Sequence, residues 1–208
     1  MRGKLAWNAA LIALLSCASC APSKPPDRPY GGSLISPSAY PGDFIDRQKI
    51  EALYGDRSLR FDAVLQKRGN ELTLLGLTPF GSRAFVIRQT GTDVSFESFV
   101  PQTFPFPPRY ILVDVHRVFF AWVREDDAPS VDSVLEAVRE GEIVTERWQG
   151  GRLSRRTFRR VDGNPPGQII VDYDPGMPRR GEPPSHITFT NGWYGYRLNI
   201  VTTSHRPL

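Results

Sequence analysis

The side chains that could carry out acid–base or nucleophilic chemistry are scattered along this sequence. The three histidines, His116, His186 and His205, are far apart in the chain. Asp114 lies two residues before His116 in a predicted helix, so these two side chains do not face each other. The sequence contains no Gly-x-Ser-x-Gly, His-Glu-x-x-His or phosphate-loop motif. We therefore expect no enzyme activity, no metal and no cofactor.

The two cysteines, Cys17 and Cys20, both follow a short apolar stretch near the N-terminus. Arg2 and Lys4 precede residues 5–15, which are mostly apolar, and this layout is typical of a secretory signal. A redox or metal-binding Cys-x-x-Cys pair is the alternative. A redox pair needs a strand-to-helix setting, and a tetrahedral metal site needs two more ligands.

Leu-Leu-Ser-Cys at residues 14–17 resembles the lipobox of a bacterial lipoprotein signal. The sequence therefore predicts a signal peptide at 1–16 and lipidation of Cys17, with Cys20 as the rival site. Several acyl chains on one cysteine give effectively permanent membrane anchoring. Ala18 follows Cys17, in place of the aspartate that retains similar lipoproteins in the inner membrane. We expect a protein anchored in the outer membrane by its lipid, with its domain facing the periplasm.

A cluster of arginines lies between residues 152 and 160. Their spacing fits one face of a helix as well as a strand, and Gly150-Gly151 before them favours the strand. Two interpretations stay open: a sheet edge guarded by charge, or a surface that attracts anionic head groups. The cluster comprises Arg152, Arg155, Arg156, Arg159 and Arg160.

The length of 208 residues suits one domain, and no apolar run reaches the roughly 18 residues of a membrane-spanning helix. Removal of the signal, with Arg2 and Lys4, lowers the formal net charge from +4 to +2. This weak charge does not predict a nucleic-acid partner. Residues 17–46 are rich in proline and predict a semi-extended tether, and residues 47–208 predict the folded domain.

Alternating apolar and polar residues separated by glycine turns predict short antiparallel strands over residues 47–99 and 142–203. Between them, the spacing of Ile111, Val115, Val118 and Phe119 predicts a helix. A second helix is expected from Ser130, as N-cap, to a stop at Gly141. The expected fold class is α+β, a curved antiparallel half-barrel sheet with two helices packed against its concave face.

Residues 75–82, which read Leu-Gly-Leu-Thr-Pro-Phe-Gly-Ser, resemble a turn of a known family. In the LolB branch of the LolA/LolB-like outer-membrane lipoprotein carriers, a Pro-Leu-Gly-Ser turn joins two strands. The chain end, with residues 187–192 and then Arg197-Leu198, is similar to the last hairpin of that family. A branch of uncharacterised bacterial lipoproteins with the same expected fold is also similar. In element order the resemblance covers residues 47–201.

The resemblance implies a half-open barrel with an apolar cavity for acyl chains, and an exposed apolar turn residue that helps deliver lipoproteins to the membrane. The matching turn residue is Phe80; the alternative is a Phe80 folded back on its own core. Proline-rich insertions at 101–108 and 174–185 depart from the family and leave room for another acylated cargo. Candidate lining residues are Leu65, Leu74, Val86, Phe96, Tyr196 and Leu198.

The function expected is to bind acyl chains and to accept or transfer lipidated cargo in the periplasm. The expected partners are the acyl chains or lipidated cargo, the membrane through the lipid anchor, and a periplasmic carrier protein. The alternative is a structural or scaffold lipoprotein of an envelope assembly, with a packed core and no cavity. A cavity of roughly several hundred Å³ would favour the carrier, and a filled interior would favour the scaffold.

Overall fold

A computed structural model describes residues 30–101, 107–120, 123, 129, 131–178 and 182–208. The predicted signal peptide, Cys17 and Cys20 lie outside the described residues, so their roles stay predictions. The elements are η1 (Pro37–Ala39), β1 (Phe44–Tyr54), β2 (Arg57–Arg68), β3 (Glu71–Leu77), β4 (Arg83–Thr90), β5 (Asp93–Ser98), α1 (Pro108–Phe119), β6 (Ser133–Arg139), β7 (Glu142–Gln149), β8 (Arg152–Arg160), β9 (Ile169–Met177), β10 (His186–Asn191) and β11 (Tyr196–Pro207).

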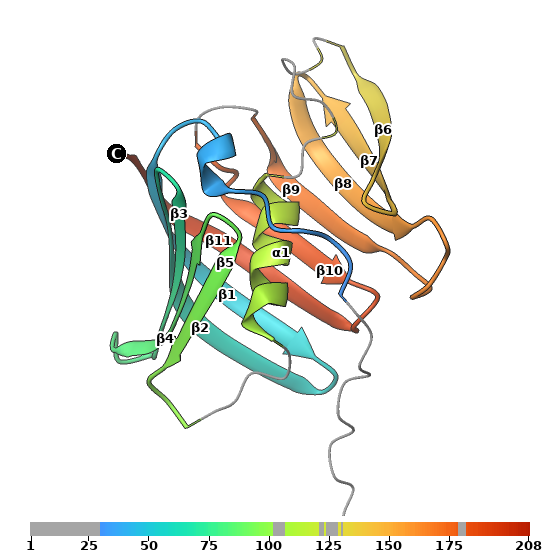
Figure 1. The fold of residues 1–208 in the computed structure, drawn as a ribbon. Helices are drawn as coiled ribbons and strands as arrows, with labels where there is room; N and C mark the ends of the chain where they lie inside the picture. Colours follow the sequence, from blue (N-terminus) through green and yellow to red (C-terminus); the bar gives the residue numbers. More distant parts are fainter. Residues whose placement is uncertain (1–29, 102–106, 121–122, 124–128, 130, 179–181) are drawn as a thin grey trace, which may run out of the picture.

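The eleven strands of the described residues form one antiparallel sheet, in the order β5-β4-β3-β2-β1-β11-β10-β9-β8-β7-β6. The long strands β1 and β11 pair at its centre and join the first half of the chain to the second. Figure 1 shows the sheet curled into an open half-barrel with α1 on its concave side. The predicted curved antiparallel sheet is therefore confirmed.

Tight glycine turns connect neighbouring strands and fix their register. Arg68 pairs with Glu71 across Gly69-Asn70, and Gln149 pairs with Arg152 across Gly150-Gly151. The three glycines have positive φ angles of 55°, 54° and 71°, which two-residue hairpin turns require and which glycine adopts without steric cost. These glycine turns are the local sequence features that predict an antiparallel meander.

Helix α1 confirms the first predicted helix. Pro108 occupies its first turn, where a missing N–H costs nothing. Its buried residues include Leu112, Val113, Val118 and Phe119, which pack into the core of the half-barrel. The helix therefore occupies space on the concave face that an open carrier would leave empty.

The second predicted helix is wrong: among the described residues its segment forms strand β6 and the turn after it. Val134 and Val138 are 61% and 68% exposed instead of forming a buried stripe. Arg139 pairs with Glu142, and the two residues between them, Glu140 and Gly141, both have positive φ. Valines have stiff, branched side chains that suit a strand, and Gly141 makes a hairpin turn rather than a helix stop. Ser130, the expected N-cap, lies outside the described residues.

Part of the predicted tether belongs to the folded domain. Residues 30–41, here called the strap, cross in front of α1, in blue in Figure 1. Tyr30 and Leu34 are 8% and 4% exposed, and Pro37 is also buried. The packed chain thus begins at least as early as Tyr30, because aromatic and aliphatic side chains within the proline-rich segment have core contacts. In the described part of the chain, no helix has the length and apolar character needed to cross a membrane.

Candidate functional site

The concave face of the sheet is apolar across strands β2 to β5. Leu65, Leu74, Ile87 and Phe96 pair in one row across these four strands, so their side chains point to the same face. Three of them are buried, and Phe96 is 38% exposed. This row places three of the six predicted lining residues together.

Two more predicted lining residues share this concave face, and one does not. Tyr196 donates a hydrogen bond to Asp114 of α1, which fixes its side of the sheet, and Leu198 is two residues further along β11. Val86 lies between Phe85 and Ile87 in β4, so its side chain points to the convex face. The period-two pattern of β4 already contained this difference, because Val86 cannot share a face with its direct neighbours.

Part of the apolar concave face is left uncovered near the β1–β2 hairpin. Leu59 pairs with Ala52, and Ala52 pairs with Leu198, so the three lie in one row. Leu59 is 63% exposed, and Tyr54, on the same face, is 46% exposed. Contiguous exposed apolar side chains of this kind mark binding surfaces more often than scattered single residues do.

Phe80 lies at the tip of the turn between β3 and β4, and its side chain is 96% exposed. The Thr78 N–H donates to the Ser82 carbonyl at 2.8 Å, and the Gly81 N–H donates to the Thr78 carbonyl at 2.9 Å. Gly81 has a φ of 79°, which closes the turn without strain. The turn is therefore tied at its base while its aromatic tip points away from the core.

The opposite side of the concave face carries buried charges that hold the end of α1. The Arg156 guanidinium donates to the carbonyl of Arg117 at 2.6 Å, and the Tyr173 hydroxyl donates to the carbonyl of Val118 at 2.7 Å. The last carbonyls of a helix have no partner within it, and they carry partial negative charge. A buried cation is therefore well placed at this end of α1.

Arg156 forms an ion pair with Glu146 of β7, at 2.9 Å between Nη2 and Oε1, and both side chains are fully buried. Glu146 also accepts from the indole N–H of Trp148 at 3.1 Å and from the Val123 backbone N–H at 3.1 Å. A buried charge is tolerated only when it is paired and hydrogen-bonded, and this pair meets both conditions.

A second buried ion pair joins α1 to β7. Arg117 lies 3.0 Å from Asp114 on its own helix and 2.7 Å from Glu142. Burial raises the pKa of Asp114, while the Arg117 charge and the hydroxyls of Tyr196 and Tyr30 oppose that shift. Burial alone would lower the pKa of Arg117, but the neighbouring Tyr30, Asp114 and Glu142 raise it, so the guanidinium stays charged.

We call these five buried side chains the ionic lock, because they bind α1 to strands β7 and β8. The sequence pattern does not indicate this lock. It predicts Arg156 at a sheet edge or on a head-group surface, and this prediction is wrong, because β8 lies inside the sheet between β7 and β9 and the Arg156 side chain is fully buried. The members are Asp114, Arg117, Glu142, Glu146 and Arg156.

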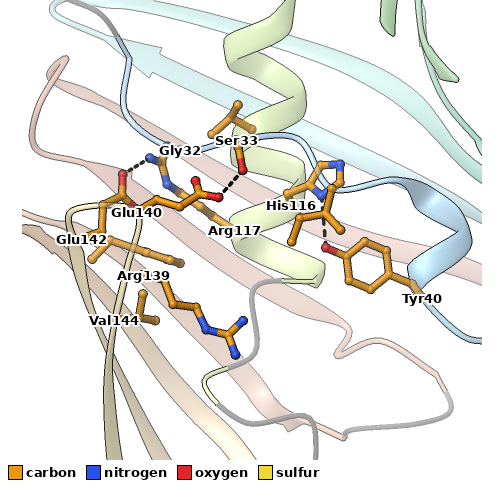
Figure 2. Close-up of a pocket in the computed structure, with 12 residues that line it drawn as sticks. Gly32, Ser33, Tyr40, His116, Arg117, Arg139, Glu140, Glu142 and Val144 are labelled. Atoms are coloured by element: carbon orange, nitrogen blue, oxygen red, sulfur yellow. Dashed lines mark hydrogen bonds and ion pairs between the residues drawn. The ribbon is translucent and has the colours of Figure 1, made fainter. Parts of the chain in front are cut away.

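A cavity of about 80 Å³ lies between the strap, α1 and strands β7 and β8, as Figure 2 shows. Gly32, Tyr40, His116, Arg117 and Glu142 are among its walls. Ligand pockets usually measure about 300–1,000 Å³, so this space holds a few water molecules rather than an acyl chain. This cavity therefore accommodates an acyl chain only if α1 or the strap moves.

His116 connects α1 to strand β4 and to the strap. Its Nε2 lies 2.7 Å from the Gln89 side-chain oxygen, and Gln89 Nε2 donates to the carbonyls of Ile35 and Gly91. The His116 Nε2 therefore carries the proton, and Nδ1 lies 3.4 Å from the hydroxyl of Tyr40. Burial lowers the pKa of His116 to about 4, so the imidazole is neutral at neutral pH.

Among the described residues, no three His, Cys, Asp or Glu side chains are grouped so that they could hold a metal ion. His186 and His205 lie on different strands from each other and away from α1. His205 lies 2.6 Å from Asp46, in the sheet pair of β1 and β11.

Comparisons with known proteins give a family and two similar solved structures. The model of the family described as Protein of unknown function (DUF3261) matches residues 46–204. No curated protein matches the chain. A LolA superfamily protein from Nitrosomonas europaea is similar, with a TM-score of 0.45 and 11% identity over 80% of this chain and 87% of that chain.

A domain from Vibrio parahaemolyticus, described as an outer membrane lipoprotein-sorting protein, is also similar. Its TM-score is 0.49 and its identity 11%, over 80% of this chain and 85% of that chain. Both TM-scores are below 0.5, so neither likeness carries a function over to this chain. The LolB branch stays a prediction.

Proposed function

The chain belongs to the DUF3261 family, and we propose that it is a lipid-anchored envelope protein that binds acyl chains on the concave face of its sheet. In this role it accepts or transfers lipidated cargo and catalyses no reaction. The observation that carries the proposal is the uncovered apolar area near the β1–β2 hairpin, where Leu59 and Tyr54 are 63% and 46% exposed. Each methylene that leaves water there contributes about 0.8 kcal/mol.

The exposed Phe80 supports the transfer step. A phenylalanine that is 96% exposed gains nothing from its own fold, but it can enter the interfacial layer of a membrane. The Phe80 turn and the β1–β2 hairpin lie at the same end of the antiparallel sheet, because β1 and β3 both end there. A membrane at this end would face both the aromatic tip and the uncovered apolar area.

A scaffold role is the second candidate, and the small cavity favours it. Helix α1 fills much of the half-barrel, and about 80 Å³ remains beneath the strap. In that role the concave face would be a permanent core, and the exposed apolar residues would contact a protein partner.

Two matched substitutions separate these candidates. Leu59→Asp places a charge on the uncovered concave area, and Val138→Asp places one on a side chain of similar exposure in β6 (63% and 68%). Native mass spectrometry of the protein purified from cells, with and without added palmitate, should show bound acyl chains in the wild type and in Val138→Asp. Leu59→Asp should lose them. An empty wild type that also ignores added palmitate would refute the acyl-binding role and leave the scaffold.

The anchor has its own test. Cys17→Ser should abolish labelling by radioactive palmitate and release the protein from the membrane fraction. Cys20→Ser should leave both unchanged. Loss of labelling only in Cys20→Ser would show that Cys20 is the lipidated residue. Full labelling in both variants would contradict the lipoprotein interpretation.

A further inference from the structure

The strap lies across the open side of the half-barrel and contacts both halves of the sheet. On one side of the half-barrel, Gln89 of β4 donates to the carbonyl of Ile35 at 2.8 Å. On the other side, the Ser33 hydroxyl donates to the carboxylate of Glu140, in the turn between β6 and β7. The strap therefore bridges strands that lie far apart in the order of the sheet.

Aromatic stacking fixes both ends of the strap on α1. Tyr30 stacks on Tyr110 with ring centroids 4.7 Å apart, and Tyr40 stacks on Phe120 at 4.2 Å. Tyr30 also donates a hydrogen bond to Asp114 and accepts one from Asn191 of β10 at 2.7 Å. These contacts press the strap onto the outer side of the helix.

Next to Tyr30, the strap is also bound to the ionic lock. Arg117 donates to the carbonyl of Gly31 at 2.6 Å with the same Nη2 that pairs with Glu142. Gly32 has a φ of 96°, and a Cβ built there would lie 2.9 Å from Val113 and 3.0 Å from Arg117. Only glycine allows the chain to approach the helix this closely.

We propose that the strap is a latch that holds α1 in the half-barrel, and that an acyl chain extends from the uncovered area onto the covered part of the concave face only when the strap is unseated. This inference rests on the proposed function, because it concerns access to the same concave face. Helix α1 covers that face, and the strap covers α1. Release of the strap removes the two aromatic stacks that hold the outer side of the helix, so α1 can then move away from the apolar strands.

The strap lies close in the sequence to the predicted lipid anchor. Cys17 lies thirteen residues before Tyr30. A chain of that length spans at most about 45 Å when fully extended. Among the described elements, the strap is the first along the chain from Cys17, so a pull from a lipid on that cysteine would tie access to the concave face to the distance between domain and membrane.

Two glycine substitutions test the latch. Gly32→Ala forces a Cβ against Val113 and should unseat the strap. Gly42→Ala is the matched control, because Gly42 also has a positive φ, of 77°, but a Cβ there meets nothing within 4 Å. Both cost backbone strain, and only the first pushes the strap from the helix.

The measurements are hydrogen exchange of residues 30–41 and binding of cis-parinaric acid, a fluorescent fatty acid, to the full chain without its lipid. A closed site that opens in roughly 10% of molecules or fewer masks affinity about tenfold or more. Gly32→Ala should speed exchange of the strap and tighten binding by about that factor, while Gly42→Ala should match the wild type. In the wild type, added fatty acid should itself speed exchange of the strap.

Each other outcome has a definite meaning. Faster strap exchange in Gly32→Ala with unchanged fatty-acid affinity would overturn the latch and leave the acyl-binding function intact. Faster exchange with no binding in any variant would overturn the proposed function itself. If Gly32→Ala leaves exchange unchanged, Tyr30→Ala, which removes the stack on Tyr110, is measured in the same way and decides the question.

Discussion

The two halves of the concave face hold α1 in opposite ways. Strands β2 to β5 present apolar side chains to the interior, and Gln89 of β4 forms a neutral hydrogen bond with His116 of the helix. Strands β7 and β8 hold the helix through the ionised pairs of Arg156 and Arg117. Removal of one partner of a buried ion pair costs about 3–5 kcal/mol, whereas a neutral hydrogen bond contributes about 0.5–1.5 kcal/mol.

This difference indicates which side of the half-barrel can open. If α1 moved away from β7 and β8, it would leave charges unpaired in a dry interior. If it moved away from β2 to β5, it would expose apolar surface, which an arriving acyl chain could cover. Ligand entry is therefore expected on the apolar side, with the ionic lock as the fixed side.

The largest effect is expected from the lock. Arg156→Ala removes a fully buried cation. It leaves the buried carboxylate of Glu146 without this ion pair, and the carbonyl of Arg117 at the end of α1 loses its hydrogen bond to the guanidinium. We expect a loss of about 3–5 kcal/mol in the free energy of unfolding. At this chain length that lowers the melting temperature by about 6–20 °C. Thermal unfolding followed by circular dichroism measures it.

The neighbouring arginine is the control. Arg155 pairs with Asp172 at 2.5 Å, but the two side chains are 50% and 41% exposed. Solvent screens such a pair, so Arg155→Ala should cost at most about 1 kcal/mol. Equal losses in the two variants would contradict the assignment of Arg156 to a lock.

A smaller effect is expected from the pH dependence of His116, which lies between the two halves. Its pKa is about 4 in the folded chain against an ordinary value of 6.5. Between these values the unfolded chain binds more protons, so stability falls as the pH drops from about 7 to about 4, by up to about 3 kcal/mol. Urea unfolding at a series of pH values measures this fall.

His116→Gln keeps a donor for Gln89 but cannot titrate, so its stability should depend less on pH over the same range. Comparison of the two proteins is needed because burial raises the pKa of Asp114, which acts in the opposite direction in acid. Parallel pH profiles of wild type and variant would show that His116 is not buried in its neutral form.

Most strands of this fold could be predicted from the sequence, because alternation and glycine turns are local signals. The error over residues 131–141 has a local cause as well. Val131, Val134, Leu135 and Val138 satisfy helical spacing, and a seven-residue strand contains too few positions to exclude it. The choice is made by pairing with β7, which is not local information.

The ionic lock could have been anticipated in part. In β7, Glu142, Val144 and Glu146 occupy every second position, so their side chains share the buried face of the strand. An acidic residue on an apolar face requires a buried cation, and the arginine cluster offered one. Which of the five arginines turns inward depends on the register shift between Leu153 and Arg155, and the sequence does not show it.

The strap could not be predicted from pattern. Its prolines and glycines are typical of a linker, and its core contacts come from the isolated side chains of Tyr30 and Leu34. Their partners, Asp114 and Asn191 among them, lie 84 and 161 residues away for Tyr30. Contacts at such separations leave no periodic signal.

The smallest effect on stability is expected at the tip of the apolar half. Phe80→Glu changes a side chain that is 96% exposed and has no core to lose, so the free energy of unfolding should change by less than about 0.5 kcal/mol. If Phe80 enters the membrane, a carboxylate there should be repelled from the apolar layer. Vesicle sedimentation of the chain without its lipid anchor should then show reduced binding of Phe80→Glu.

A buried phenylalanine in the next strand supplies the contrast. Phe85 is 7% exposed on the concave face, and Phe85→Ala should cost about 3–5 kcal/mol. The pair therefore distinguishes a contact residue, where stability holds and vesicle binding falls, from a core residue, where stability falls. A Phe80→Glu variant that binds vesicles as the wild type does would assign the membrane contact elsewhere. Tyr54 and Leu59, the exposed apolar residues near the β1–β2 hairpin, would then be the next to substitute.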